Sequence, residues 1–196
     1  AARNGDVPAM LLGRFNDILA WNRSGHLLLA GHLDFEAPRR EEDRPNQLRL
    51  LFLDPHTRDL YANWENEAAL AVASLRYVAA DYADDRRLAE LVGDLSMNST
   101  EFASLWAGHD VRLCTSGTKR FRHPQVGELE LRYEVLHLPE GNGQRILTHT
   151  ADPGSSSFAA LRLLTSNAGH PQTWRNAPPS TPHSDPVTWR AFGDSR

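Results

Sequence analysis

The sequence predicts an α+β fold, in which an antiparallel sheet is covered on one side by a block of helices. Residues 128–135 alternate apolar and charged side chains, which is the pattern of a strand with one buried and one wet face. Residues 64–82 instead repeat apolar side chains at the 3.6-residue period of a long helix. Strand patterns lie towards both ends of the chain, with helical patterns between them. This order indicates that the helices and the strands are segregated.

The first predicted elements are two short strands within residues 7–21, joined at a turn around residues 15–17. Asn22 follows the second strand and is a preferred N-cap residue, so a short helix is expected there, closed near Gly31. The next segment, 34–45, is charged and contains two prolines, which is typical of a solvated loop. Strands are therefore expected over about 7–21, and helices over about 22–109.

Capping residues mark the starts of the later helices. Each of them precedes an apolar repeat, and one is followed by proline at the first helical position. These starts are Asn46, Asp54-Pro55, Asp84 or Asp85, and Asn98 or Ser99, whereas the long helix from Trp64 is predicted from its apolar period alone. Strands are then expected over about 110–151, with a turn at 139–143, and a last helix over about 155–166. We expect one domain over 1–166, followed by a proline-rich C-terminal tail over 167–196.

Composition restricts the class of protein. The formal net charge of -4 argues against a chain whose main task is to bind nucleic acid. The single cysteine, Cys114, excludes an internal disulfide framework and agrees with a reducing cytoplasm. No run approaches the ~20 apolar residues that a membrane helix needs. The sequence begins at Ala1 rather than at methionine, so we expect it to be a piece of a longer polypeptide or a processed chain.

The basic segment 119–124 has two interpretations. It can lie at a strand end and pair with Glu128, Glu130 and Glu134 across a hairpin. Alternatively, Lys119, Arg120 or Arg122 can contact an anionic ligand head group or DNA phosphates, because cations recognise such groups through charge-assisted hydrogen bonds.

Catalytic and metal motifs are not found. The nine histidines include no HxxxH or HExxH pair, so no metal site is expected. Residues 116–119 lack the Gly-Lys-Ser/Thr order of a phosphate-binding loop, and no Gly-x-Ser-x-Gly elbow occurs. Cys114 has no sequence neighbour that would mark a reactive thiol. The sequence therefore predicts neither an enzyme nor a cofactor.

Several runs resemble the ligand-binding domain of MmyB-like transcriptional regulators, in collinear order over about residues 7–165. The runs are LAWN at 19–22, LLFLDP at 50–55, LAELVGDL at 88–95, LWAGHDVR at 105–112, SGTK at 116–119 and HPQVGEL at 123–129. The resemblance implies a PAS-like antiparallel sheet covered on one side by helices. It also implies an actinobacterial, cytoplasmic regulator whose N-terminal helix-turn-helix domain, absent from this chain, binds DNA. The implied ligand is a small apolar, fatty-acid-like molecule.

Aromatic residues on predicted inward faces are the main candidates for a ligand site. Most such residues form solid core, but a PAS-like domain often keeps a cavity between its sheet and its helices. The candidate ligand-binding residues are Trp21, Phe52, Trp64, Phe102, Trp106, Val111, Leu113, Leu129, Leu131, Tyr133 and Arg122.

Two other functions stay open. In one, the aromatics fill the interior and the domain serves as a dimerisation or interaction module without a ligand. In the other, a small cavity enzyme uses His109 or His123 as a base, which would require a buried histidine–carboxylate pair at a cleft. A ligand-sensing domain without catalysis, free of membrane contact and able to form a homodimer, is the expectation that the sequence favours.

Overall fold

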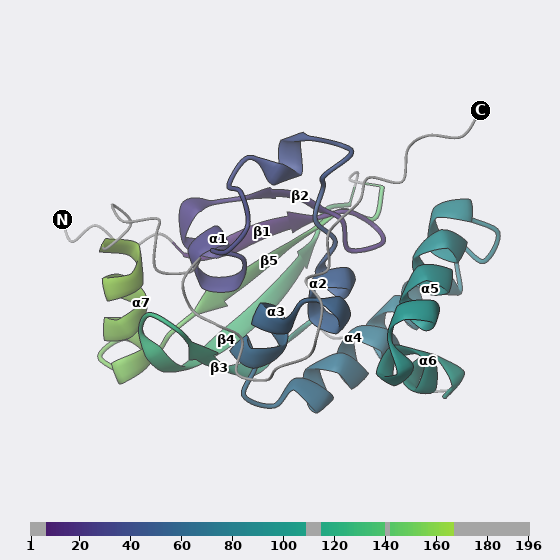
Figure 1. Ribbon diagram of the computed structural model, residues 1–196. Coiled ribbons are helices and arrows are strands. Elements are labelled where there is room, and N and C mark those ends of the chain that lie inside the picture. The colour runs from purple at the N-terminus through teal and green to yellow at the C-terminus, as the bar shows by residue number, and fades with distance from the viewer. Residues whose placement is uncertain (1–6, 109–114, 140–141, 167–196) are drawn as a thin grey trace.

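A five-stranded antiparallel sheet forms the centre of the chain (Figure 1). The computed structural model describes residues 7–108, 115–139 and 142–166. The strands are β1 (Ala9–Leu12), β2 (Ile18–Trp21), β3 (Ser116–His123), β4 (Gly127–His137) and β5 (Arg145–Thr150), in the spatial order β2-β1-β5-β4-β3. The β1–β2 hairpin and the three-stranded meander β3–β4–β5, from distant parts of the chain, thus meet along β1 and β5. The predicted α+β class is confirmed.

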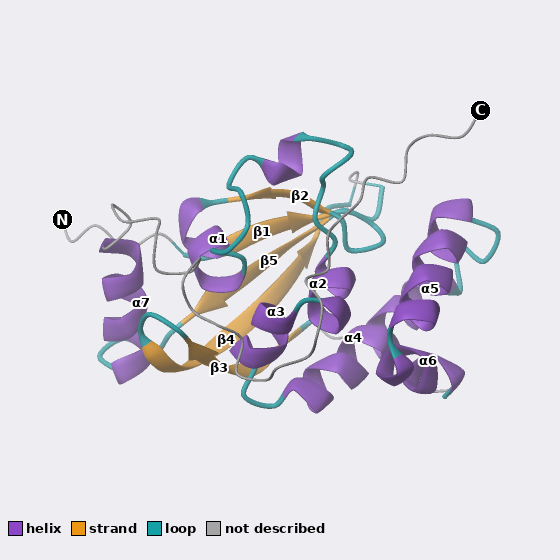
Figure 2. Cartoon of the chain, viewed as in Figure 1, coloured by secondary structure: helices purple, strands orange, loops and turns teal. Residues whose placement is uncertain are grey.

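Seven α-helices and a short 3-10 helix occupy the described part of the chain (Figure 2). They are α1 (Arg23–Leu29), η1 (Ala37–Arg39), α2 (Gln47–Leu53), α3 (Pro55–Leu60), α4 (Trp64–Ala79), α5 (Arg86–Asn98), α6 (Thr100–Ala107) and α7 (Ser156–Ser166). Side chains of the predicted capping residues accept hydrogen bonds from backbone N–H groups of the first turns. These caps are Asn22, Asn46, Asp54, Asp85 and Ser99. The element η1 lies in the charged segment that the sequence pattern assigns to a loop.

Side chains along β4 alternate between the buried inner face and the exposed outer face of the sheet, as the sequence predicts. Leu129, Leu131 and Tyr133 are buried, and Glu130 and Arg132 between them are exposed. In β1 the buried residues are Met10 and Leu12, at 2% exposure each. Helices α1, α2 and α3 lie over one face in Figures 1 and 2. The burial pattern and the ribbon agree that one side of the sheet carries the core.

Helix α7 covers the part of β4 that β5 does not reach. The backbone N–H of Glu130 donates to the hydroxyl of Ser157 over 2.9 Å, and α7 also contacts α1. The N-terminal half of β4 is therefore paired with β3 on one edge and packed against α7.

Residues 119–123 of the basic segment lie inside β3 and Pro124 follows it, whereas the sequence pattern places the segment at the end of a strand. Residues 109–114, including Val111, lie outside the described residues. The register sets Arg120 opposite Glu130 and Arg122 opposite Glu128. Opposite charges at directly facing positions attract, so the register supports the hairpin interpretation for these two arginines.

Phe102 provides a test of the helical core. Its side chain is fully buried, with its ring 5.1 Å from that of Phe52 and 5.9 Å from that of Trp106. Phe102→Ala should lower the free energy of unfolding by about 3–5 kcal/mol in urea titrations, because it leaves a cavity. Met97 is 87% exposed, so Met97→Ala should change the free energy of unfolding by less than about 0.5 kcal/mol. Equal effects of the two substitutions would contradict this packing.

Candidate functional site

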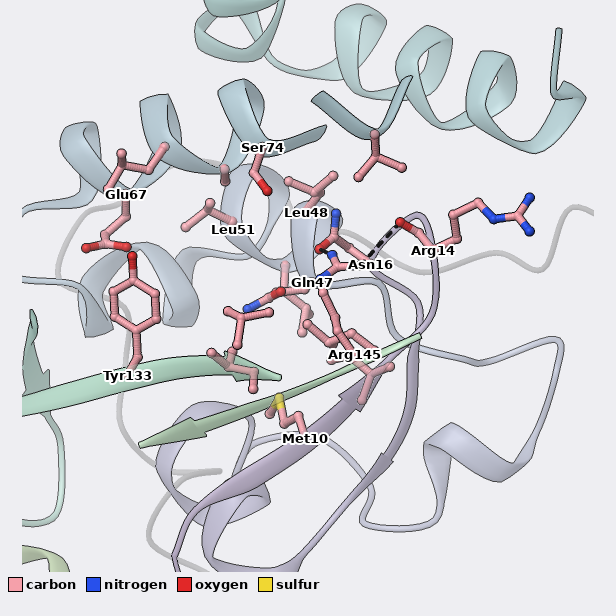
Figure 3. A pocket seen from close by; sticks show the side chains of 18 of the residues that line it. Met10, Arg14, Asn16, Gln47, Leu48, Leu51, Glu67, Ser74, Tyr133 and Arg145 are labelled. Carbon is pink, nitrogen blue, oxygen red and sulfur yellow. Dashed lines mark hydrogen bonds between the residues drawn. The ribbon is translucent and has the colours of Figure 1, made fainter. Parts of the chain in front are cut away.

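A cavity of about 270 Å³ lies between the inner face of the sheet and helices α2 and α4. Figure 3 shows side chains from both walls converging on it. The sheet contributes mainly apolar side chains, and so do the helices. The apolar lining includes Met10, Leu12, Val135 and Leu147 from the strands, and Leu48, Leu51, Leu70, Ala71 and Val78 from the helices. A mainly apolar hollow with a few polar groups is the usual form of a small-molecule site.

One end of the cavity holds an internally neutralised ion pair. Lys119 on β3 donates to the carboxylate of Glu67 on α4, and Glu67 is 7% exposed. The linker between α3 and α4 makes this contact possible, because the N–H of Ala62 donates to the Arg120 carbonyl over 2.9 Å. The Lys119 ammonium also lies 4.7 Å from the centre of the Tyr133 ring. Charge at this end is therefore balanced within the protein.

The other end carries a buried guanidinium. Arg145, the first residue of β5, is 8% exposed and lines the cavity. Its Nη1 donates to the carbonyls of Gly13 at 3.0 Å and Arg14 at 3.4 Å, and its Nη2 donates to the side-chain oxygen of Asn16. Burial lowers the pKa of the Arg145 guanidinium, yet an arginine stays protonated in proteins. This end of the cavity is therefore positive.

The Asn16 backbone shapes the turn that receives Arg145. Asn16 has φ of 70°, a left-handed conformation that asparagine adopts more readily than most residues. The turn is closed by hydrogen bonds of 2.8 Å from the Gly13 N–H to the Asp17 carbonyl and of 3.1 Å from the Asn16 N–H to the Gly13 carbonyl. Carbonyls of the β1–β2 turn thus face the start of β5.

Two histidines on the inner face are held neutral. Burial lowers the pKa of His123 to about 4, against a partly opposing hydrogen bond with the Leu27 carbonyl at 3.0 Å. Burial lowers the pKa of His149 to about 3, and the positive charge of Lys119 adds to the effect. Neither ring nitrogen of His149 has a hydrogen-bond partner within the described part of the chain.

Among the described residues, His32, Asp54 and His56 form a group with potential metal-ligand atoms within 4.8 Å of one another. The two imidazole rings are stacked 4.7 Å apart at 15°, so their in-plane lone pairs run nearly parallel instead of converging on one ion. Both oxygens of Asp54 already cap α3. Burial raises the pKa of Asp54, but hydrogen bonds from His32 and Thr57 outweigh it and lower the value to about 2. This group ties the start of α3 to the loop that follows α1 and does not resemble a metal cage.

The predicted ligand residues divide between the cavity and its surroundings. Tyr133 lines the cavity, and Leu129 and Leu131 are buried farther along β4, outside the lining. Trp21 is also outside it; its indole donates to the Phe35 carbonyl over 2.8 Å. Arg122 is exposed on β3.

The other predicted aromatics gather where α2, α4 and α6 meet. The Phe52 ring lies 5.7 Å from Trp64 and 5.1 Å from Phe102, in edge-to-face contacts, and Trp106 stacks on Phe102. None of these four residues lines the cavity. Val111 and Leu113, together with His109 and Cys114, lie outside the described residues.

Sequence reasoning missed Arg145 as a site residue. A signal was present: Leu147 is an inward-facing residue of a six-residue strand, and period 2 places Arg145 and His149 on the same face. The sequence offers Lys119 as an anion contact, but its partner Glu67 lies 52 residues earlier and no local pattern links them.

Comparison with protein families gives a match over residues 2–164, to the MmyB-like transcription regulator ligand binding domain. The chain belongs to this family. Comparison with curated proteins gives no match. In this MmyB-like domain the match spans every described strand and reaches Leu164 in α7. Within the described residues, no helix is both long and apolar enough to cross a membrane.

The buried histidines predict acid sensitivity of the MmyB-like domain. Their folded-state pKa values lie below the ordinary value of 6.5, so the unfolded chain takes up protons first as the pH falls. Stability should be constant above about pH 7 and then fall by up to about 1.4 kcal/mol per histidine per pH unit, until the folded-state pKa values near 4 and 3 are reached. Urea unfolding at about pH 7.5, 6 and 5 measures this decline in stability.

His149→Leu should make the decline below about pH 6.5 shallower without loss of stability at neutral pH, because an unpartnered polar group leaves the core. His137 is exposed on β4, so His137→Gln serves as the control and should leave the slope unchanged. An unaltered pH slope in His149→Leu would contradict the assignment.

Proposed function

We propose that this chain is the ligand-sensing domain of a DNA-binding transcription regulator and that its cavity binds a small apolar, fatty-acid-like molecule. The observation that carries the proposal is the mainly apolar cavity of about 270 Å³ inside a domain of a ligand-binding family. In this proposal DNA is contacted only through a helix-turn-helix domain that this chain does not contain. The regulator acts in the cytoplasm, and the domain is regulatory rather than catalytic.

The order of the elements supports the PAS-like fold that is part of this proposal. The chain runs through two strands, a block of helices, three strands and a helix, and the sheet order is β2-β1-β5-β4-β3. Ligands of such a domain are expected between the sheet and its helices, where the cavity lies. The domain boundary at about residue 166 and the tail at 167–196 are part of the proposal; the tail lies outside the described residues.

The proposed mechanism is a population shift. A ligand that fits one packing of sheet and helices better than another favours it by the difference in binding free energy. That difference is transmitted to the DNA-binding domain as a coupling free energy, through the domain itself or through a homodimer.

Two alternatives make different predictions. A solid interaction module would lack a cavity, and the described cavity weighs against that option. An enzyme that uses His123 as a base would need this ring at a cleft beside a carboxylate. His123 is 2% exposed, hydrogen-bonds the Leu27 carbonyl and does not line the cavity, which also weighs against catalysis.

Binding of saturated fatty acids, from octanoic to hexadecanoic acid, tests the function by native mass spectrometry and thermal shift. We expect one-to-one complexes and a melting temperature that rises with ligand concentration, because binding to the folded state alone stabilises it. No complex at any length would overturn the fatty-acid-like assignment.

Ser74→Phe tests the location. Ser74 on α4 lines the cavity, and its side chain points towards it in Figure 3. A phenyl ring there should occupy ligand volume and weaken fatty-acid binding by at least about tenfold, equivalent to about 1.4 kcal/mol. Ala89 is exposed on α5, so Ala89→Phe is the matched control and should bind normally. Normal binding by folded Ser74→Phe would place the ligand elsewhere.

A further inference from the structure

We propose that Arg145 binds the anionic head group of the cavity ligand, so that an acyl acid lies with its carboxylate at the β1–β2 turn. Its chain then runs towards the Lys119–Glu67 pair. This inference rests on the proposed function, because it names the head group and the orientation of the ligand in the same cavity.

Arg145 is a buried cation without a counter-ion. Among the described residues, no carboxylate forms an ion pair with it, although it is 8% exposed and lines the cavity. Its contacts are two backbone carbonyls and the amide oxygen of Asn16. Such neutral oxygens hold the guanidinium in place but do not cancel its charge, and an uncompensated buried charge is costly. An anion in the cavity would supply the missing compensation.

The guanidinium also retains donor capacity. Arginine has five N–H groups, and the hydrogen bonds to the β1–β2 turn use Nη1 and Nη2. The Nε group makes no hydrogen bond within the described part of the chain. A carboxylate that bridges Nε and Nη2 would have the bidentate geometry in which arginine pairs most strongly.

Among the residues that the structure describes, the other charged groups at this end form no ion pair with Arg145. Asn16 and Gln47 carry amide groups on the lining, and Arg14 lines the same end. Arg14 is already paired with Asp85 at 3.6 Å, so it adds little net charge. Asp81 is an exposed lining residue that makes no ion pair with Arg145. Arg145 is therefore the source of uncompensated positive charge here.

The opposite end is unsuitable for a free carboxylate. Glu67 already occupies Lys119, and a second carboxylate there would meet the negative charge of Glu67. Figure 3 shows Glu67 and Tyr133 on one side of the cavity and Arg145 and Asn16 on the other. The apolar lining between these groups, including Leu48, Leu51 and Leu147, fits a hydrocarbon chain. The distribution of charge thus sets one direction for an acidic amphiphile.

The decisive comparison uses the unaltered chain. Saturated fatty acids from octanoic to hexadecanoic acid and the primary alcohols of the same lengths are titrated by calorimetry at a pH where the acids are ionised. The acids should bind at least about tenfold more tightly than the matching alcohols, since a charge-assisted hydrogen bond is lost in the alcohol. Acids and alcohols that bind equally would overturn the head-group assignment and leave the proposed function intact. No binding by either series would overturn both.

Arg145→Gln then assigns the preference to the residue, because glutamine keeps donors but removes the charge. The acid-over-alcohol ratio should fall to about one, while alcohol binding changes little. Arg122→Gln is the matched control on the exposed face of β3 and should keep the full ratio. Thermal unfolding monitors the fold of each variant, and the unaltered chain remains decisive if Arg145→Gln does not fold. A folded Arg145→Gln with an unchanged ratio would overturn the proposal.

Discussion

Pairing between β1 and β5 joins the β1–β2 hairpin to the β3–β4–β5 meander in one sheet, and the candidate site depends on this contact. It brings the start of β5 beside the β1–β2 turn, so that Arg145 reaches the Gly13 carbonyl across 132 residues of sequence. Such a long-range contact is entropically expensive to close and must be held by side-chain as well as backbone bonds. The same bonds place a guanidinium at the end of the cavity. In the proposed binding mode, fold stability and ligand recognition share one set of contacts.

The inner face of the sheet carries more polar groups than a minimal core would need. Lys119, Arg145 and His149 on this face, and Glu67 on α4 opposite it, are all buried or half-buried, and each incurs a desolvation cost. Only Lys119 and Glu67 compensate each other. Groups that do not maximise stability are typical of sites selected for function. Both cations are at least half-buried, so burial alone does not distinguish them. Lys119 is paired with a carboxylate and can be structural, whereas Arg145 has no such partner among the described residues and is the better candidate for ligand binding.

Local patterns were sufficient for the elements and insufficient for the site. Some signals depend only on a few neighbouring residues, so the positions of the elements could be predicted from them. Examples are the two-residue period of β4 and the capping residues of α2, α3, α5 and α6. Phe52, Trp64 and Phe102 were expected to face inwards, and they do. Apolar patterning does not distinguish a helix–helix core from a cavity wall, because both bury the same side chains. The cavity ends are set by tertiary contacts such as Lys119–Glu67, which no spacing rule reveals.

Helix α4 is the wall through which a ligand would have its effect. Its main helix contacts are with α2 and α6, and its other side borders the cavity, across from β1, β4 and β5. Arg76 links α4 to α6 by donating to the carbonyls of Leu105 and Trp106. A ligand that fills the cavity adds contacts on the sheet side of α4 without replacing those to α6. If α4 and α6 shift together, the new packing makes more or fewer contacts with the ligand. The two packings then differ in ligand affinity, and a population shift requires such a difference.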